Sequence, residues 1–395
     1  MSSWQTTSIR KLVEPIQTWS PSRGNPDGVF LYIDLAAVDQ SAKTIVGTRE
    51  VACSDAPSRA RQLVSTDDVL VSTVRPNLNG VAKVNSELDG ATASTGFCVL
   101  RPRRDVLSCN YLFHWVKSPH FVADMVSKAT GASYPAVSDR IILESRVAIP
   151  SLSEQRHIAS ILDQVDTLRA KRREALAQLD SLTHSIFIEM FGDPVTNSKN
   201  LPLKLLNHVA IFENGDRSSS YPSGDDIKAE GVLFLSTKNI TDGRLDLTKS
   251  VFITQKKFES LSRGKAKRND LIITLRGTLG SCCIFDTTHE TAFINAQMMI
   301  IRPGPGCQSK YLHALLTSKQ AQERFDHIGH GAAVPQLTSG QLASLQIPMP
   351  PLADQQKFSS RIKAIDKLKE NQNQELVELN ALFSSIQHRA FRGEL

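Results

Sequence analysis

Two long stretches of the chain, 151–191 and 352–391, carry apolar residues with a seven-residue period. Their spacing alternates between four and three residues, which is typical of a coiled coil of helices. At 1.5 Å per residue, about 40 residues give a helix roughly 60 Å long. We expect the seam between the two helices to run through Ile161, Val165, Leu168, Arg172, Leu179, Leu182 and Ile186 of the first, and Ile365, Leu368, Gln372, Leu379, Leu382 and Ile386 of the second.

The two helical stretches are copies of each other at an offset of 200 residues. Gln155, Asp166, Leu168, Leu176, Leu179, Leu182, Ser185, Ile186 and Phe191 recur as Gln355, Asp366, Leu368, Leu376, Leu379, Leu382, Ser385, Ile386 and Phe391. Such agreement at one offset indicates a duplicated unit, in which a globular part is followed by a long helix. Approximate two-fold symmetry between the copies makes the expected helix pairing antiparallel. The alternative is two unrelated amphipathic helices, each packed on its own domain.

The ends of the helical stretches carry capping signals. Ser151 and Glu154 have the spacing of a capping box, and Gly192 followed by Pro194 suits a left-handed C-terminal cap. The second stretch follows Pro350 and Pro351 and stops near Gly393. We therefore divide the chain into a domain at 1–150, a helix at 151–191, a second domain at 192–351 and a helix at 352–395.

The two globular parts repeat more weakly. The β-branched runs 69–74 and 271–275 match and predict buried strands, while 110–128 and 310–326 predict short helices. The glycine–proline stretches 131–135 and 331–335 also match, although 36–66 and 239–268 do not. We predict α+β domains with mixed or mostly antiparallel sheets, and divergent loops are typical of two binding domains with different targets.

Composition and charge narrow the class of protein. The chain has 395 residues and a net charge of +6, with 16 basic and 14 acidic residues in 1–150 and 18 and 14 in 192–351. The positive charge thus lies in the globular parts, which suits contact with a polyanion, and a mildly basic protein without such a partner is the alternative. The six cysteines form no Cys-x-x-Cys pair, no apolar run spans a membrane, and residues 1–5 lack signal-peptide features. We expect a cytoplasmic protein with no metal site.

The motifs of an enzyme are missing. The sequence has no phosphate-binding Gly-x-x-x-x-Gly-Lys-Ser/Thr loop, no Gly-x-Gly-x-x-Gly and no Asn/Asp-Pro-Pro-Tyr/Phe run of an amino-methyltransferase. The carboxylates at 67–68 and 225–226 suit turns better than a catalytic pair, since only Asp68 recurs, as Asp270. We predict no catalytic residues, although nuclease carboxylates leave a faint trace in sequence.

Basic and amide side chains give the candidate contacts to nucleic acid. A basic run lies between 256 and 268, and an arginine follows each of the two matched strands beside polar or glycine residues. Such side chains contact phosphates and base edges, although solvated loops and structural arginines have the same composition. The candidates for DNA binding are Arg75, Asn77, Asn79, Lys238, Lys256, Lys257, Lys265, Lys267, Arg268, Arg276 and Thr278.

The start of each long helix carries a pattern that resembles a known family. The stretches 149–159 and 347–356 read Ile-Pro-Ser-Leu-Ser-Glu-Gln-Arg-His-Ile-Ala and Ile-Pro-Met-Pro-Pro-Leu-Ala-Asp-Gln-Gln. Preceded by Gly-x-x-x-Pro-x-x-Ser/Thr, they resemble the specificity subunit of Type I restriction-modification systems over essentially the whole chain. The family pattern has Pro-Pro-Leu in both copies, whereas the first copy here has Pro-Ser-Leu.

The resemblance implies a non-catalytic subunit that reads a bipartite, asymmetric site on double-stranded DNA through two target recognition domains. The paired helices would space these domains and dock two methyltransferase subunits, and restriction/translocase subunits would join the complex. S-adenosylmethionine, ATP and magnesium would then bind to the partners and not to this chain. A protein-binding two-domain scaffold and a metal-dependent nuclease with a cryptic site are the competing hypotheses.

Overall fold

The computed structural model describes residues 4–25, 27–329 and 335–395 of the chain. It divides into two units: unit 1 comprises 1–174 and 373–395, and unit 2 comprises 175–372. Each unit therefore holds one globular part together with portions of both long helices, α5 (Leu152–Phe191) and α10 (Leu352–Ala390).

Unit 1 has a globular part built from strands and four short helices. Its strands are β1 (Gln5–Ser8), β2 (Val13–Glu14), β3 (Val29–Ile33), β4 (Val38–Asp39), β5 (Thr44–Ile45), β6 (Arg49–Ala52), β7 (Ala60–Leu63), β8 (Val69–Ser72), β9 (Val81–Lys83), β10 (Thr92–Ser94), β11 (Phe97–Pro102) and β12 (Arg146–Ile149). Its short helices are α1 (Pro21–Gly24), α2 (Cys109–Val116), α3 (Pro119–Lys128) and α4 (Asp139–Glu144). Two four-stranded sheets, β6-β3-β10-β7 and β2-β11-β8-β9, form its framework.

Unit 2 repeats this arrangement. Its strands are β13 (Leu203–Leu205), β14 (Ala210–Asn214), β15 (Ile227–Lys228), β16 (Val232–Leu235), β17 (Ile240–Thr241), β18 (Arg244–Leu245), β19 (Val251–Ile253), β20 (Lys265–Lys267), β21 (Leu271–Thr274), β22 (Cys282–Ile284), β23 (Thr291–Ile294), β24 (Met298–Pro303) and β25 (Gln346–Pro348). Its short helices are α6 (Gln255–Ser260), α7 (Ser309–Leu316), α8 (Lys319–Gly329) and α9 (Ser339–Ala343). The sheets β15-β19-β16-β23-β20 and β14-β24-β21-β22 correspond to those of unit 1.

The sheets are mixed, as the sequence predicts for an α+β fold. In each unit one strand pair is parallel, β3 with β10 and β16 with β23, whereas the other pairs within these sheets are antiparallel. Strands β8 and β21 are buried over almost their whole length, which confirms the two strands expected from β-branched residues. The helical stretches after them each split into two helices at Ser118 and Ser318, and the Ser118 hydroxyl caps α3.

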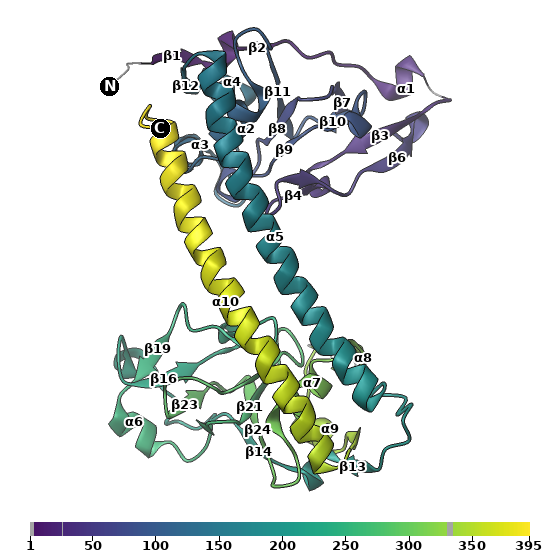
Figure 1. Ribbon diagram of the computed structural model, residues 1–395, viewed down its shortest axis with the longest axis vertical. Helices are drawn as coiled ribbons and strands as arrows, with labels where there is room; N and C mark the ends of the chain where they lie inside the picture. The colour runs from purple at the N-terminus through teal and green to yellow at the C-terminus, as the bar shows by residue number, and fades with distance from the viewer. Residues whose placement is uncertain (1–3, 26, 330–334) are drawn as a thin grey trace. The chain divides into compact units, whose positions relative to one another are not determined.

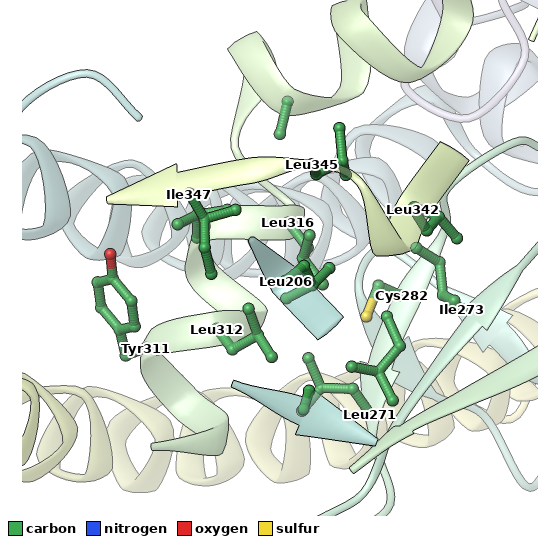
Figure 2. Close-up of a cluster of buried hydrophobic side chains, with 14 of the residues drawn as sticks. Leu206, Leu271, Ile273, Cys282, Tyr311, Leu312, Leu316, Leu342, Leu345 and Ile347 are labelled. Atoms are coloured by element: carbon green, nitrogen blue, oxygen red, sulfur yellow. The ribbon is translucent and has the colours of Figure 1, made fainter. Parts of the chain in front are cut away.

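Each globular part has its own hydrophobic core, which both long helices complete. In unit 2 the core joins strand β21, helix α7 and residues such as Phe187 of α5 and Phe358 of α10. Figure 2 shows Leu271, Ile273, Cys282, Leu312 and Leu316 among the side chains of this cluster. The α5 and α10 ribbons run side by side within each unit (Figure 1).

Helix pairing is antiparallel in both units. In unit 1, Arg169 of α5 bonds to Asn380 of α10, and Arg172, further along α5, pairs with Glu375, earlier on α10. In unit 2, Lys369 of α10 bonds to Thr183, and Phe358 packs against Phe187. The antiparallel coiled coil expected from the heptads is thus present in each unit, and the Arg172–Glu375 pair supplies a polar seam contact of the kind that fixes register.

The predicted seam is wrong at four of its thirteen residues, two in each helix. Leu168, Leu182, Leu368 and Leu382 are between 45% and 52% exposed, so they do not form the helix contact. The next residue along each helix takes that place: Arg169, Thr183, Lys369 and Phe383. The heptad places a leucine at each of these four positions, whereas three of the four residues found there instead are polar, and their side chains bond to the opposite helix.

The remaining seam predictions fit the observed packing more closely. Val165 and Ile365 are buried in the cores of units 1 and 2. Leu179, Ile186, Leu379 and Ile386 are partly buried against the same cores. Ile161 and Gln372 are half-buried.

The capping predictions are confirmed. The Ser151 amide donates to the Glu154 carboxylate at 2.9 Å, and the Glu154 amide donates to the Ser151 hydroxyl at 3.3 Å. Gly192 adopts φ = +75° just after α5, a conformation that glycine reaches without a steric penalty.

A buried glutamine fixes each globular part to the helix that follows it. The Gln155 side chain is fully buried, accepts a hydrogen bond from the Ser108 amide at 2.8 Å, and donates to the Val106 and Pro150 carbonyls at 3.0 Å. In unit 2, Gln355 accepts from the Gln308 amide and donates to the carbonyls of Gly306 and Pro350. Both units therefore use the same three hydrogen bonds, which explains why this glutamine is among the repeated residues.

Candidate nucleic-acid interface

Arg75 lies at the tip of the loop that follows the buried strand β8. Its backbone is left-handed, with φ = +50°, and its side chain is exposed. Its amide donates to the Pro135 carbonyl at 2.7 Å, and Val74 forms a β-bridge with Ala136. The loop after β8 and the glycine–proline loop at 131–135 are therefore joined through their backbones.

An exposed aromatic ring stands beside this arginine. The Arg75 guanidinium lies 4.8 Å from the centre of the Tyr134 ring, and 69% of Tyr134 is accessible to solvent. Such a contact is worth about 0.5–1 kcal/mol at an exposed site, so it orients the guanidinium without burying it. Figure 1 shows strands β8 and β9, between which the Arg75 loop runs.

The two asparagines predicted beside Arg75 have different environments. Asn77 is exposed on the short 3-10 helix Pro76–Leu78. Asn79 has φ = +47°, and its amide group donates to the Val116 carbonyl at 2.8 Å, which ties the loop to the end of α2. Asn77 is thus the one with a side chain free to meet a ligand.

A third segment supports the same loop. Lys43, in the turn between β4 and β5, donates to the Asn79 carbonyl at 2.5 Å. Burial and the neighbouring Lys117 ammonium lower the pKa of Lys43 to about 8. Burial also lowers the pKa of Lys117, although its ion pair with Asp166 of α5 at 2.5 Å counteracts the effect.

Unit 2 presents the equivalent loops with different side chains. Arg276 is exposed after strand β21, forms a β-bridge with Gln336, and donates from Nε to the Gln336 side-chain oxygen at 3.1 Å. Thr278 is exposed, and its carbonyl accepts from the Thr274 hydroxyl. Residues 331–334 of the second glycine–proline stretch lie outside the described residues.

The basic run of unit 2 occupies a separate surface. Lys256 and Lys257 belong to α6, Lys265 and Lys267 to the edge strand β20, and Arg268 to the turn that follows. Because β21 lies between them, Arg268 and Arg276 stand near opposite ends of that strand. The structure therefore brings Arg276 and Thr278 together but keeps them apart from the lysines. Lys238 is exposed on the short 3-10 helix Thr237–Asn239.

Several of these cations already have partners. Lys257 pairs with Asp226 at 3.1 Å, Lys265 lies 4.8 Å from the centre of the Phe258 ring, and Arg268 donates to the Thr287 carbonyl at 2.7 Å. Lys256 and Lys267 are exposed. Strand β20 alternates Lys265, buried Ala266 and Lys267, so both lysines project from its outer face.

The carboxylates that recur in both domains hold the fold together. Asp68 is buried and accepts two hydrogen bonds from Arg101, at 2.9 and 2.7 Å, and Asp270 accepts the equivalent pair from Arg302. Each also accepts a bond from a turn amide, of Ser65 and of Lys267. Within the described part of the chain, no group of three or more His, Cys, Asp or Glu residues could hold a metal ion.

Sequence reasoning missed Tyr134 and Lys43 as parts of this site. Tyr134 lies in the glycine–proline stretch, but an exposed tyrosine and a core tyrosine look the same in a single sequence. Lys43 lies in a stretch that does not match the other domain, so the repeat could not single it out.

The structure thus contains a duplicated α+β domain with an exposed arginine loop in each copy, and each copy packs on antiparallel portions of the two long helices. The family model described as "Type I restriction modification DNA specificity domain" matches residues 62–178 and 210–381. The chain therefore belongs to the family of Type I restriction-modification specificity subunits, as its sequence pattern indicates.

Individual relatives agree with this assignment. The chain is 22% identical over 328 residues to the Type I restriction enzyme EcoBI specificity subunit of Escherichia coli, covering 75% of this chain and 68% of that protein. It is 20% identical to the putative MjaX specificity subunit of Methanocaldococcus jannaschii, over 99% and 93% of the two chains. A chain from a structural study of complex assembly and conformational transition in the type I R-M system has a TM-score of 0.60 at 25% identity, with 100% and 99% of the two chains covered.

None of the described helices is both long enough and apolar enough to cross a membrane.

Proposed function

We propose that this chain is the non-catalytic subunit that reads a bipartite, asymmetric site on duplex DNA, with one half-site for each globular domain. One observation carries the proposal: both domains hold an exposed arginine at the junction of the same two loops, Arg75 in unit 1 and Arg276 in unit 2. The frame is shared, whereas the side chains around the arginines differ. A shared frame with different loop residues suits domains that read different sequences.

The chemistry that follows recognition belongs, in this proposal, to partner subunits in the cytoplasm. Two methyltransferase subunits would bind S-adenosylmethionine and modify adenine, and restriction/translocase subunits would use ATP and magnesium. The residues of this chain position the complex on DNA.

The exposed leucines of the long helices suggest where the methyltransferase subunits dock. Unit 1 exposes Leu168 and Leu382, and unit 2 exposes Leu182 and Leu368. Because 168 and 368, like 182 and 382, are equivalent by the repeat, each unit presents the same pair. Each leucine directly precedes a seam residue. In an antiparallel pair of equivalent helices, residues just before the seam lie on the same face of the pair, so the two leucines of each unit share one face. Two equivalent apolar pairs suit two identical partners.

Replacing the leucines of one unit should remove one methyltransferase subunit. Leu168→Glu with Leu382→Glu places two carboxylates in the proposed contact. Because only about half of each leucine is exposed before docking, losing their apolar contact alone costs about 1.5–3 kcal/mol of association. We expect native mass spectrometry of the assembled complex to show one methyltransferase subunit in place of two. Ala170→Glu with Ala381→Glu, at exposed positions of the same helices, is the control. Unchanged stoichiometry with the leucine variant would contradict this docking surface.

Gel-shift of duplex DNA with the assembled complex tests the function itself. We expect an unlabelled duplex that carries the recognition site to displace the bound DNA far better than unrelated duplexes of equal length do. A complex that binds all duplexes equally would favour the protein-binding scaffold. Cleavage of DNA by the isolated chain with magnesium would favour the nuclease.

A further inference from the structure

The two arginine loops share one residue and differ in what accompanies it. Arg75 and Arg276 follow equivalent strands and adjoin equivalent second loops, although the residue that bridges the second loop is Val74 in unit 1 and Arg276 itself in unit 2. The second-loop side chain that contacts the arginine is Tyr134 in unit 1 and Gln336 in unit 2, and these two residues lie at different positions of the loop, since Gln336 corresponds to Ala136. A residue common to domains with different targets suits contacts that every target offers, such as phosphates, and a residue that differs suits base reading.

The unit 1 pair is built for contact with a ligand. Arg75 keeps a left-handed backbone although it has a β-carbon, and residues held in this region cost of order 1–3 kcal/mol and cluster at functional sites. Backbone bonds from Arg75 to Pro135 and a bridge from Val74 to Ala136 hold the strained turn against the second loop. The bond to Pro135 and the contact with the Tyr134 ring hold the guanidinium in place, so it loses little further freedom on binding.

Tyr134 itself has no role in the core of unit 1. More than two-thirds of its surface is exposed, and its ring faces the guanidinium of Arg75. Leu78, on the loop of Arg75, is also 41% exposed. An aromatic face and an apolar side chain beside a cation suit a DNA groove, where rings and methyl groups contact bases while the cation meets a phosphate.

The unit 2 pair offers hydrogen bonds in place of an aromatic face. The side-chain oxygen of the half-buried Gln336 accepts from Arg276 Nε, and its amide NH₂ is a hydrogen-bond donor. Glutamine forms two hydrogen bonds with the major-groove edge of adenine, and a tyrosine ring cannot form this pair of bonds. The two companions would therefore favour different bases.

We propose that the companion on the second loop, Tyr134 in unit 1 and Gln336 in unit 2, determines part of the half-site that its domain reads, while Arg75 and Arg276 bind the DNA backbone. The inference rests on the proposed function, and it adds the residues that discriminate between bases. Tyr134 contacts a base through its ring, and Gln336 contacts a base edge through its amide.

The test uses the assembled complex and a set of duplexes in which each base pair of the wild-type recognition site is substituted in turn. Affinities are measured by competition at fixed salt. We expect Tyr134→Ala to reduce discrimination at one or more positions of one half-site by roughly five- to hundredfold, and to leave the other half-site unchanged. Gln336→Ala should do the same in the other half-site. Tyr134→Phe, which keeps the ring, should retain discrimination.

The arginine is tested separately from folding. Arg75→Gly removes the guanidinium at a position where glycine adopts φ = +50° without strain, so the thermal unfolding of the complex should not be lowered. We expect it to weaken binding to all duplexes by a similar factor and to reduce the salt dependence of binding by about one ion.

The outcomes separate the inference from the function on which it rests. A wild-type complex without sequence preference overturns both. A wild-type complex with a bipartite preference, together with a Tyr134→Ala complex that discriminates within twofold of wild type at every position, overturns the inference and leaves the proposed function standing.

Discussion

Exchanging residues 1–150 for the first domain of another family member is expected to change one half of the recognised sequence completely and leave the other half unaltered. The two units have separate cores, and the arginine loop of each belongs to its own globular part. Each wrong base pair costs about 1–3 kcal/mol, so a new domain should lower affinity for the original half-site by several orders of magnitude.

The exchange requires that the contacts of the first domain with both helices survive. Phe391 packs its ring against Tyr111 and Trp115 at 5.3 and 5.1 Å between centres, and Gln387 donates to the His114 carbonyl at 3.1 Å. The donor domain should therefore carry matching aromatic residues on the equivalent of α2. The control is the reciprocal exchange of 192–351, which should alter the other half-site. A change in both half-sites after either exchange would show that the two domains do not recognise their half-sites independently.

Replacing Gln155 with alanine should strongly destabilise unit 1. The change leaves the Ser108 amide and the carbonyls of Val106 and Pro150 without partners in a buried place. Each unsatisfied buried group costs about 1–3 kcal/mol, so we expect a loss of about 3–5 kcal/mol in the free energy of unfolding of unit 1. Hydrogen exchange read by mass spectrometry should show faster exchange in α2 and the start of α5, with unit 2 unaffected.

The second copy provides a matched comparison. Gln355→Ala should produce the same loss in unit 2, whereas Gln356→Ala, at an exposed position of α10, should leave exchange unchanged. If Gln155→Ala costs under 1 kcal/mol, the glutamine does not anchor the domain to its helix.

The helical framework could be predicted from sequence because its signals are local. The capping box of Ser151 and Glu154 and the left-handed cap at Gly192 depend on residues a few positions apart. The repeat at 200 residues also predicted the antiparallel pairing, because two equivalent helices related by approximate two-fold symmetry pair in opposite directions. Strands β8 and β21 followed from their β-branched runs.

The seam and the site depended on long-range contacts that the sequence does not contain. Leu168 looks like a seam residue until the bond from Arg169 to Asn380 and the position of Phe383 are known. The seam register is decided by partners about 200 residues away, and polar residues can satisfy it. Asn79 likewise resembles a base-reading residue, yet its amide is used by the Val116 carbonyl.

We infer that each unit reads its own half-site. The most direct measurement is single-molecule sequencing of DNA modified by the assembled complex, which gives every methylated adenine and the sequence around it. We expect one asymmetric motif, with two specified parts separated by a spacer of fixed length and free sequence. A single uninterrupted motif, or methylation without a common sequence, would contradict it.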